Sequence, residues 1–359
     1  MSRLTEALRH NRILWLMPAV PLPLAAEALA PGAHTLVFLL SILAIVPLAA
    51  LLSLATEQVA ARTGDTIGGL LNATLGNLTE LLIALAALQA GEYLLVKATI
   101  AGAIVTNTLF MTGMCFLLGG LRHQVQDFNS ASTRLQVALL FLAAFGLVVP
   151  STLADMDQQT LPSSLSLAIA LILLAAYGFS LVFTLGTHRT YFAAAGHEAD
   201  AAEAWPLGLA IAVLLGATVV VALVSEVFVA SLTGAASGLG LTPAFVGFVV
   251  VAIVGAAAEM TAAFSAARRN RLDLSLGISF GSAAQIALFV APVLVLLSHV
   301  MGPSPMSLQF WPGAVAMIFI ATLTAALTTA SGHSAWFIGL LMVMVYAIFG
   351  ATLFILPPA

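Results

Sequence analysis

Two segments decide the fold of this chain: GNLTELLIALAAL at residues 76–88 and GAAAEMTAAFSAA at residues 255–267. Each segment places one glutamate, Glu80 or Glu259, inside an apolar helix, four residues after a glycine. A carboxylate in the hydrocarbon of a bilayer is costly and is typical of transport or proton movement. Two carboxylates in matching contexts, about half the chain apart, predict one site built by two copies of a repeat.

The composition is that of a polytopic membrane protein. Of the 359 residues, 61% are hydrophobic and 7% are charged, and the mean hydropathy is +1.11. A soluble domain is excluded, because about a quarter of its residues would be charged. Since roughly 20 apolar residues span the hydrocarbon as a helix, the sequence predicts eleven spans between residues 13 and 356. The single cysteine, Cys115, falls inside a span, so a disulfide framework and a thiolate metal site are excluded.

The predicted fold class is an all-α polytopic membrane protein with two inverted five-helix repeats and an accessory first helix. An odd number of spans in each repeat inverts one repeat relative to the other, as in many transporters. Landmarks recur at equal distances after the two glutamates: Gly102 follows Glu80 as Gly281 follows Glu259, and Thr106 likewise corresponds to Gln285. The predicted domains are the N-terminus with helix one (1–34), the first repeat (35–185), a linker (186–205) and the second repeat (206–359).

Two further glutamates lie in similar contexts near span ends, Glu57 in LATEQVA and Glu226 in LVSEVFVA. A carboxylate there reaches water, so interface anchoring and a secondary role in ion or proton access both remain open. The linker carries Glu198, Asp200 and Glu203. It is interpreted either as a solvated linker or as a cytosolic acidic segment that attracts a divalent cation.

The distribution of basic residues predicts the orientation. With the N-terminus in the cytosol, ten of the eleven Lys and Arg residues face the cytosol and only Lys97 lies outside, as the positive-inside rule requires. We therefore expect an inner (plasma) membrane protein with its C-terminus outside, or one in a vacuolar-type membrane if the source is eukaryotic.

The residues around the two glutamates suit a hard cation. Gly76 and Gly255 permit local unwinding, which frees backbone carbonyls, and Asn77 shares the helical face of Glu80. Neutral oxygens from neighbouring spans complete the predicted metal site: Thr106, Asn107, Ser282 and Gln285. Oxygen ligands without histidine or thiolate favour an ion such as Ca²⁺. Facing carboxylates also hold protons readily, so cation and protons would compete for one site.

At these residues the chain resembles the calcium/proton antiporters of the calcium/cation antiporter superfamily. The resemblance rests on GGLLNATLGNLTELLIAL (68–85), FVGFVVVAIVGAAAEM (245–260), NTLFMTGMCFLLGGLRHQVQDFN (107–129) and LSLGISFGSAAQIALFVAPVLVL (274–296). It implies an eleven-helix fold with Glu80 and Glu259 as the central cation and proton ligands. The chain departs from the family pattern at Ala256, where an Asn is expected, at Met260, where a His is expected, and at Ala103, where a Ser is usual.

We therefore expect a secondary antiporter that exports cytosolic Ca²⁺ in exchange for protons by alternating access. It would use no cofactor, would be no enzyme and would bind no nucleic acid; its partners are the bilayer, Ca²⁺ and protons, and a homo-oligomer is left open. The alternative is an antiporter of the same fold that moves Na⁺ or K⁺ against H⁺, or Na⁺ against Ca²⁺. A membrane-embedded protease is disfavoured, because the spans carry no paired aspartates, Ser/His pair or zinc motif.

Overall fold

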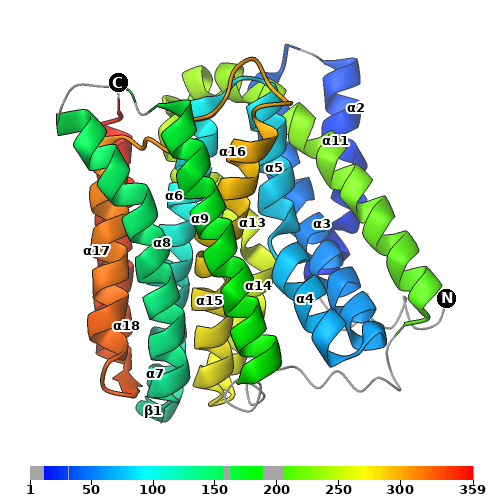
Figure 1. The fold of residues 1–359 in the computed structure, drawn as a ribbon. Helices are drawn as coiled ribbons and strands as arrows, with labels where there is room; N and C mark the ends of the chain where they lie inside the picture. Colours follow the sequence, from blue (N-terminus) through cyan, green and yellow to red (C-terminus); the bar gives the residue numbers. More distant parts are fainter. Residues whose placement is uncertain (1–11, 31, 157–159, 161, 189–204, 359) are drawn as a thin grey trace.

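The computed structural model describes residues 12–30, 32–156, 160, 162–188 and 205–358. Its helices stand side by side and run mostly between the two ends of the molecule (Figure 1). Within this described part, nine helices are long and apolar enough to cross a membrane. Two helix pairs, each bent at a short break, pass the same test together and bring the number of spans to eleven. The architecture is therefore the predicted all-α polytopic fold.

The first half of the chain begins with a short accessory pair of helices that packs on the long helix α3. Its elements follow in this order: η1 (Arg12–Ala19), α2 (Pro21–Leu29), α3 (His34–Thr63), α4 (Asp65–Leu75), α5 (Leu78–Gln89), α6 (Tyr93–Val105), η2 (Thr106–Met111), α7 (Thr112–His123), β1 (Val125–Asp127), α8 (Ser130–Met156), α9 (Ser163–Leu181) and η3 (Val182–Thr187). The segments η2 and η3 are π-helical turns that continue α6 and α9.

The second half repeats this order of helices without the accessory pair. Its elements are α11 (Leu207–Leu239), α12 (Pro243–Phe245), η5 (Val246–Val251), α13 (Ala252–Gly255), α14 (Ala257–Arg268), α15 (Leu272–Gln285), η6 (Ile286–Val290), α16 (Ala291–Leu297), α17 (Pro312–Thr329), β2 (His333–Ala335) and α18 (Trp336–Ile355). The long helices α3 and α11, which open the two repeats, pack against each other.

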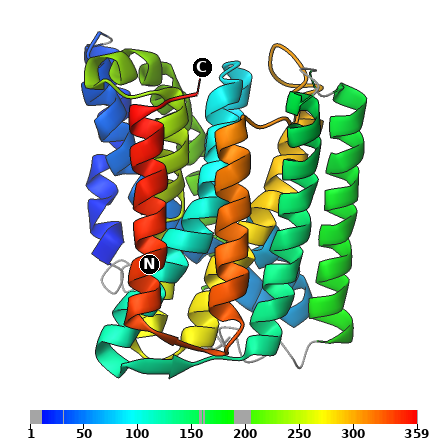
Figure 2. The ribbon, with the colours of Figure 1, turned by 90° about the vertical axis from the view of Figure 1, so that its left-hand side faces the viewer.

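A two-stranded sheet marks one end of the molecule, called the sheet end below. Strand β1 pairs antiparallel with β2, with Val125 opposite Ala335 and Asp127 opposite His333. The pairing joins the connection between α7 and α8 to the connection between α17 and α18 (Figure 2). Segments from both halves of the chain are thereby fastened together.

An extended loop, residues 298–311 and called the strap below, marks the opposite end. The backbone amides of alternate strap residues donate to hydroxyl oxygens: Ser304 N to Tyr93 OH (2.8 Å), Met306 N to Ser298 Oγ (2.8 Å), Leu308 N to Ser166 Oγ (3.1 Å) and Phe310 N to Ser151 Oγ (3.0 Å). The side chains of Met306, Leu308 and Phe310 are buried. Three of these bonds satisfy the amides of residues whose side chains are buried, where an unpaired amide would be costly.

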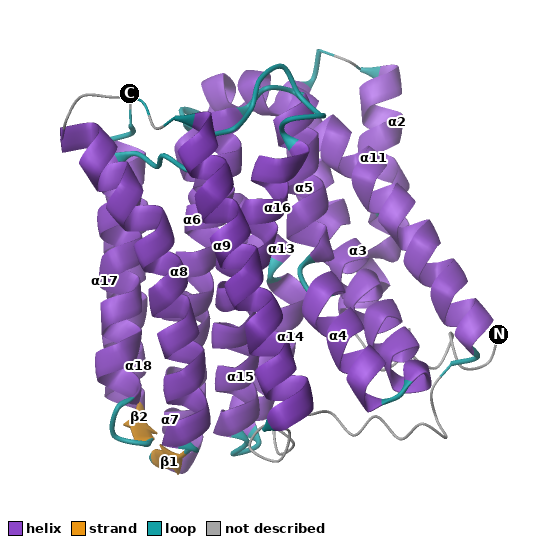
Figure 3. Ribbon diagram, in the orientation of Figure 1, coloured by secondary structure: helices purple, strands orange, loops and turns teal. Residues whose placement is uncertain are grey.

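The two bent spans meet in the middle of the molecule. One bends by 41° between α4 and α5, and the other by 59° between α13 and α14. Both breaks lie at mid-height between the ends (Figure 3), and α13 contacts α5. Helix α4 rises from the sheet end whereas α12 descends from the strap end, so the repeats are inverted as predicted.

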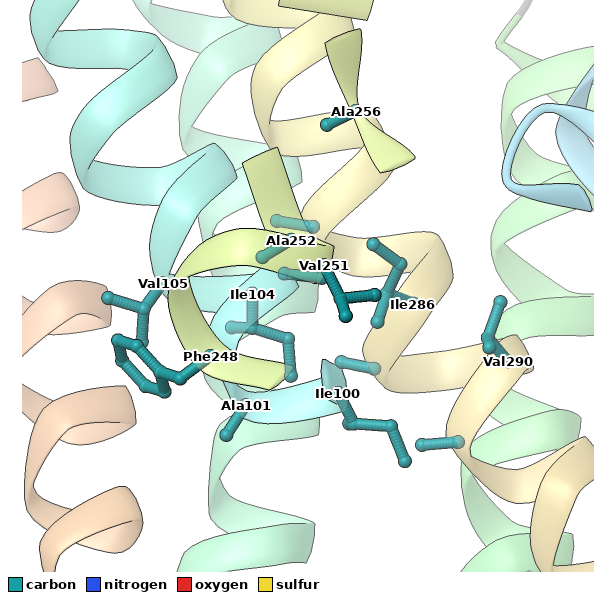
Figure 4. Packing of buried hydrophobic residues seen from close by; sticks show 14 of the residues in the cluster. Ile100, Ala101, Ile104, Val105, Phe248, Val251, Ala252, Ala256, Ile286 and Val290 are labelled. Carbon is teal, nitrogen blue, oxygen red and sulfur yellow. The ribbon is translucent and has the colours of Figure 1, made fainter. Parts of the chain in front are cut away.

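The core around the breaks is packed closely because small residues let helices approach. Figure 4 shows Phe248 and Val251 of η5 beside Ile100 and Ile104 of α6. A Cβ added at Gly102 of α6 would collide with the backbone of Phe248. This contact joins a span of the first repeat to the bent span of the second.

Candidate cation site

Both central glutamates lie directly after a helix break. Glu80 is in the first turn of α5 and Glu259 is in the first turn of α14, rather than in the middle of a continuous helix. The two half-helices start at mid-height and run to opposite ends of the molecule, so their N-termini converge. A helix N-terminus carries a partial positive charge that stabilises a nearby carboxylate.

The side chain of Glu80 lies against the other repeat. Glu80 is 3% exposed, and a Cβ added at Gly255 would lie 3.0 Å from its Cγ and 3.3 Å from its Cδ. Glu259 is partly exposed, and it is close enough to Glu80 for the two carboxylate charges to interact. One carboxylate from each repeat therefore contributes to a shared site.

A chain of three hydrogen bonds connects the predicted neutral ligands. Asn77 Nδ2 donates to Gln285 Oε1 at 2.5 Å, and Ser282 Oγ donates to Asn77 Oδ1 at 2.7 Å. Asn107 Nδ2 donates to Ser282 Oγ at 2.8 Å. The structure thus brings Asn77, Asn107, Ser282 and Gln285 together, from three different spans. Gly76 belongs to the same cluster, since a Cβ added there would lie 3.3 Å from Gln285 Oε1.

Two oxygen atoms near this chain are left without a protein donor. Among the described residues, Glu259 Oε2 and Asn107 Oδ1 are buried acceptors with no hydrogen-bond partner. Such acceptors are costly to bury unless a donor, a proton or a cation completes them. Carboxylate and amide oxygens are ligands that Ca²⁺ prefers. The unpaired atoms fit a site that binds a hard cation or protons in turn.

Thr106 differs from the other predicted ligands. Its Oγ1 donates to Tyr346 OH of α18 at 3.0 Å instead of joining the Asn77 chain. Sequence reasoning did not identify Tyr346, nor Tyr177, whose OH donates to Ala73 O at 2.5 Å. The sequence contains one indication that the two tyrosines are equivalent: they are as far apart in the sequence as Glu57 and Glu226.

The two outlying glutamates are not part of the central cluster. Glu226 is exposed on α11 and lines a pocket of about 420 Å³ near the strap end, together with Gln89 and Glu92. Glu57 is exposed on α3 toward the sheet end. The acidic residues of the linker, Glu198, Asp200 and Glu203, lie outside the described residues.

Comparison with known proteins identifies the family. Residues 33–186 and 209–355 match the family described as sodium/calcium exchanger protein. A Ca(2+)/H(+) antiporter from Synechocystis sp. is 39% identical over 363 residues, which cover 96% of this chain and 97% of the relative. The chain belongs to the Ca²⁺/H⁺ antiporter (CAX) family. This family lies within the sodium/calcium exchanger superfamily, so the protein is a membrane transporter and not an enzyme.

Other CAX relatives and solved structures agree in length and fold. The Ca(2+)/H(+) antiporter ChaA of Bacillus subtilis is 36% identical, with 96% of this chain and 100% of the relative covered. The structure of native YfkE superposes with a TM-score of 0.82 at 31% identity, covering 96% of this chain and all of that one. A sodium-calcium exchanger structure, NCX_Mj, shares the fold at a TM-score of 0.55 and 17% identity, over 90% of this chain and 99% of that one. The predicted resemblance and fold class are confirmed.

The bent spans of this CAX family member are packed differently in the two repeats. At the strap end, η5 is docked on α6 through Phe248 and Gly102. At the sheet end the equivalent glycine, Gly281 of α15, is uncovered: a Cβ there would meet no described atom within 4 Å. Helix α4 instead packs on η3, where a Cβ at Gly69 would lie 2.6 Å from Leu185 Cδ2. The half-helix at the strap end is therefore docked on α6 of the other repeat, whereas at the sheet end α4 leaves the equivalent glycine of α15 uncovered.

Proposed function

We propose that this protein exchanges Ca²⁺ for protons, with Glu80 and Glu259 binding either the cation or protons. The observation that carries the proposal is the pair of carboxylates from opposite repeats beside the unpaired oxygens Glu259 Oε2 and Asn107 Oδ1. The cyanobacterial and Bacillus relatives, which bear the name Ca²⁺/H⁺ antiporter and align over nearly their whole length, support it.

The charges of the two carboxylates couple the movement of the cation to the movement of protons. Two facing carboxylates repel each other, and either one divalent cation or two protons removes that repulsion. In this mechanism Asn77, Asn107, Ser282 and Gln285 offer neutral oxygens to the cation, and carbonyls near Gly76 and Gly255 add to them. The neutralised site can pass from one end to the other, whereas the empty, doubly charged site cannot. Exchange follows without leakage of either ion.

The direction of transport follows from the proposed orientation. Arginines of several elements, among them Arg122, Arg134 and Arg268, lie at the sheet end, and Lys97 lies beside the strap, where its Nζ donates to Ser307 Oγ at 3.2 Å. The positive-inside rule then makes the sheet end cytosolic. The protein would take Ca²⁺ from the cytosol there and release it past Glu226 at the strap end, while Glu57 serves access from the cytosol. The membrane would be a plasma membrane, or a vacuolar membrane as in the rice vacuolar cation/proton exchanger 2, which is 36% identical over 95% of this chain and 80% of the relative.

A second candidate is exchange of Na⁺ or K⁺ against protons, or of Na⁺ against Ca²⁺. The observation that favours it is the loss of polar groups beside Glu259, where Ala256 and Met260 are buried and offer no side-chain oxygen. Fewer side-chain ligands weaken selection for a divalent cation.

The test is cation-driven proton movement in proteoliposomes, comparing the parent with Glu80→Gln and Glu259→Gln. Glutamine keeps the shape of the side chain but can neither release a proton nor supply a full charge, so exchange should fall to background in both variants. Glu27→Gln, in the accessory helix α2, is the matched control and should exchange like the parent. Full exchange by either central variant would refute the site. Competition by Na⁺ and K⁺ in the same vesicles separates the two candidate functions.

A further inference from the structure

Two tyrosines occupy equivalent places in the two repeats. Tyr177 lies on α9 and Tyr346 on α18, the last helix of each repeat. The ring of Tyr177 packs on Phe289 with centroids 5.3 Å apart, and the ring of Tyr346 packs on Phe110 at 5.2 Å. Phe110 and Phe289 have the same separation along the sequence as the two central glutamates. The ring contacts are thus related by the pseudo-symmetry of the fold.

The hydroxyls of the two tyrosines break this symmetry. Tyr177 OH donates to Ala73 O, in the last turn of α4, at 2.5 Å. Tyr346 OH accepts from Thr106 Oγ1 at 3.0 Å and does not bond Ala252, the equivalent of Ala73. The carbonyl of Ala252 accepts instead from the amide of Ala256 at 3.3 Å. One tyrosine therefore holds its bent span, and the other does not.

The length of each helix break accounts for this difference. In the first repeat two residues, Gly76 and Asn77, separate α4 from α5, whereas in the second repeat Ala256 alone separates α13 from α14. Because one more residue is unwound in the first repeat, the carbonyl of Ala73 accepts no hydrogen bond within the helix. A carbonyl at mid-membrane depth needs a donor, and Tyr177 supplies it.

The positions of the two half-helices show the same difference. Gly69 of α4 and Phe248 of η5 are equivalent, because they are as far apart in the sequence as the two central glutamates. Phe248 sits on Gly102 of the central helix α6, whereas Gly69 sits on Leu185 of η3, which continues the helix that carries Tyr177. The half-helix that is docked on α6 also contacts α18, the last helix of its own repeat, through the rings of Phe245 and Phe354 (5.5 Å). A half-helix thus contacts the last helix of its own repeat in both positions, and it contacts the central span only where its end is closed.

We infer that Tyr177 and Tyr346 are positioning residues that hold the open half-helices in alternation. In the described state Tyr177 holds α4 away from α15 through the Ala73 carbonyl. In the opposite state α4 covers Gly281 and regains its extra helical residue, while α13 unwinds and Tyr346 OH takes the carbonyl of Ala252. The inference deepens the proposed function, on which it rests, because it names side chains that set the balance between the two states.

Phenylalanine tests the hydroxyl alone, because it preserves the ring contacts with Phe289 and Phe110. Tyr177→Phe leaves the carbonyl of Ala73 without its donor only in the described state, so it should favour the opposite state. Tyr346→Phe should favour the described state, since Thr106 can turn its hydroxyl to its own helix backbone. One net hydrogen bond corresponds to a shift of roughly two- to tenfold in the ratio of the states. The double variant should return toward the parent ratio.

The measurement is the distance between spin labels placed at Leu70→Cys on α4 and Leu121→Cys on α7, in a Cys115→Ala background. Leu70 and Leu121 are exposed, and α7 packs on α15. Closure of the sheet end therefore shortens the distance. Pulsed EPR over a pH and Ca²⁺ series gives the population of each distance. Tyr93→Phe, which removes a hydroxyl bonded to the strap, is the matched control and should leave the populations unchanged.

Shifts of opposite sign for Tyr177→Phe and Tyr346→Phe support the inference. Equal shifts, no shifts, or one unchanging distance in all variants would overturn it. The readout does not depend on which ion is carried. If the parent fails to exchange Ca²⁺ for protons while the two variants still shift the populations in opposite directions, the proposed function is wrong and the inference about the tyrosines is supported. If exchange needs both glutamates but the tyrosine variants do not change the populations of the two distances, the inference about the tyrosines is wrong and the proposed function is supported.

Discussion

Gly102 and Gly281 occupy equivalent positions in the two repeats, yet the backbone of Phe248 covers Gly102 and no described atom covers Gly281. The two glycines display both docking arrangements of a bent span in a single structure. A molecule that alternates between its ends must at some point cover Gly281 as Gly102 is covered now.

Gly281→Leu should trap the described state. The side chain has room while α4 stands away from α15, but it prevents α4 from docking there. We expect Ca²⁺ binding in detergent to stay within about threefold of the parent, because the ligands remain in place, and exchange in proteoliposomes to be lost. Gly178→Leu is the control, since a Cβ at Gly178 also meets no described atom within 4 Å. Parent-like exchange by Gly281→Leu would contradict the closure.

Gly255→Ala should weaken cation binding without unfolding the protein. The new methyl group would lie 3.0 Å from Glu80 Cγ and would push the carboxylate out of place. Alanine favours a helix over glycine by up to about 1 kcal/mol, so the melting temperature should not fall in step with affinity. We expect a loss of about tenfold in Ca²⁺ affinity by calorimetry. Gly216→Ala on α11, where a Cβ meets no described atom, is the control; equal affinities in both variants would exclude contact of Gly255 with the ligand set.

Ala256→Asn should tighten Ca²⁺ binding most when combined with Ala103→Ser. Asn77 is held by Ser282 and Gln285, whose equivalents in the first repeat are Ala103 and Thr106. A lone asparagine at 256 would lack the serine partner, so its amide would be only half satisfied. A double-mutant cycle on Ca²⁺ affinity should give a favourable coupling of about 0.5–3 kcal/mol. Additive effects would show that the second repeat does not rebuild the arrangement of the first.

Ca²⁺ affinity should fall as pH falls, because carboxylates must lose their protons to bind a cation. If both central glutamates release a proton, the apparent affinity changes by up to about 100-fold per pH unit over the titrating range. Calorimetry in buffers of different ionisation enthalpy counts the protons released. Glu80→Gln should reduce the count by one if it binds at all, and a pH-independent affinity would contradict the competition.

The central pair and the span count could be predicted from sequence because they rest on strong signals. A charged residue is rare in an apolar span, and Glu80 and Glu259 stand at equal distances from Gly102 and Gly281. The breaks before the glutamates were foreseen only as local unwinding near Gly76 and Gly255. Their unequal lengths depend on which end of the molecule is closed, and no periodicity in the sequence records that.

The tyrosines were missed for a different reason. A tyrosine in an apolar helix usually packs in the core with its hydroxyl bonded locally, so composition does not distinguish Tyr177 or Tyr346 from other aromatic residues. Thr106 was predicted to be a ligand from its spacing alone, whereas in the structure its hydroxyl donates a hydrogen bond to Tyr346 OH. Spacing places a residue in the right span, but its partner depends on helices far away in the chain.

The strap and the small sheet turn part of the protein into a stiff frame. The strap fastens α6, α8, α9 and α16 at one end, and the strands fasten the connections α7–α8 and α17–α18 at the other. Gln126 of β1 also secures the final turn of α14 by donating to Ala267 O at 2.9 Å. Several elements are not held by any of these bonds, among them α3, α11, α4 and the segment from α12 to α13. In the proposed exchange these elements move, and heat or denaturant should loosen them while the frame is still intact.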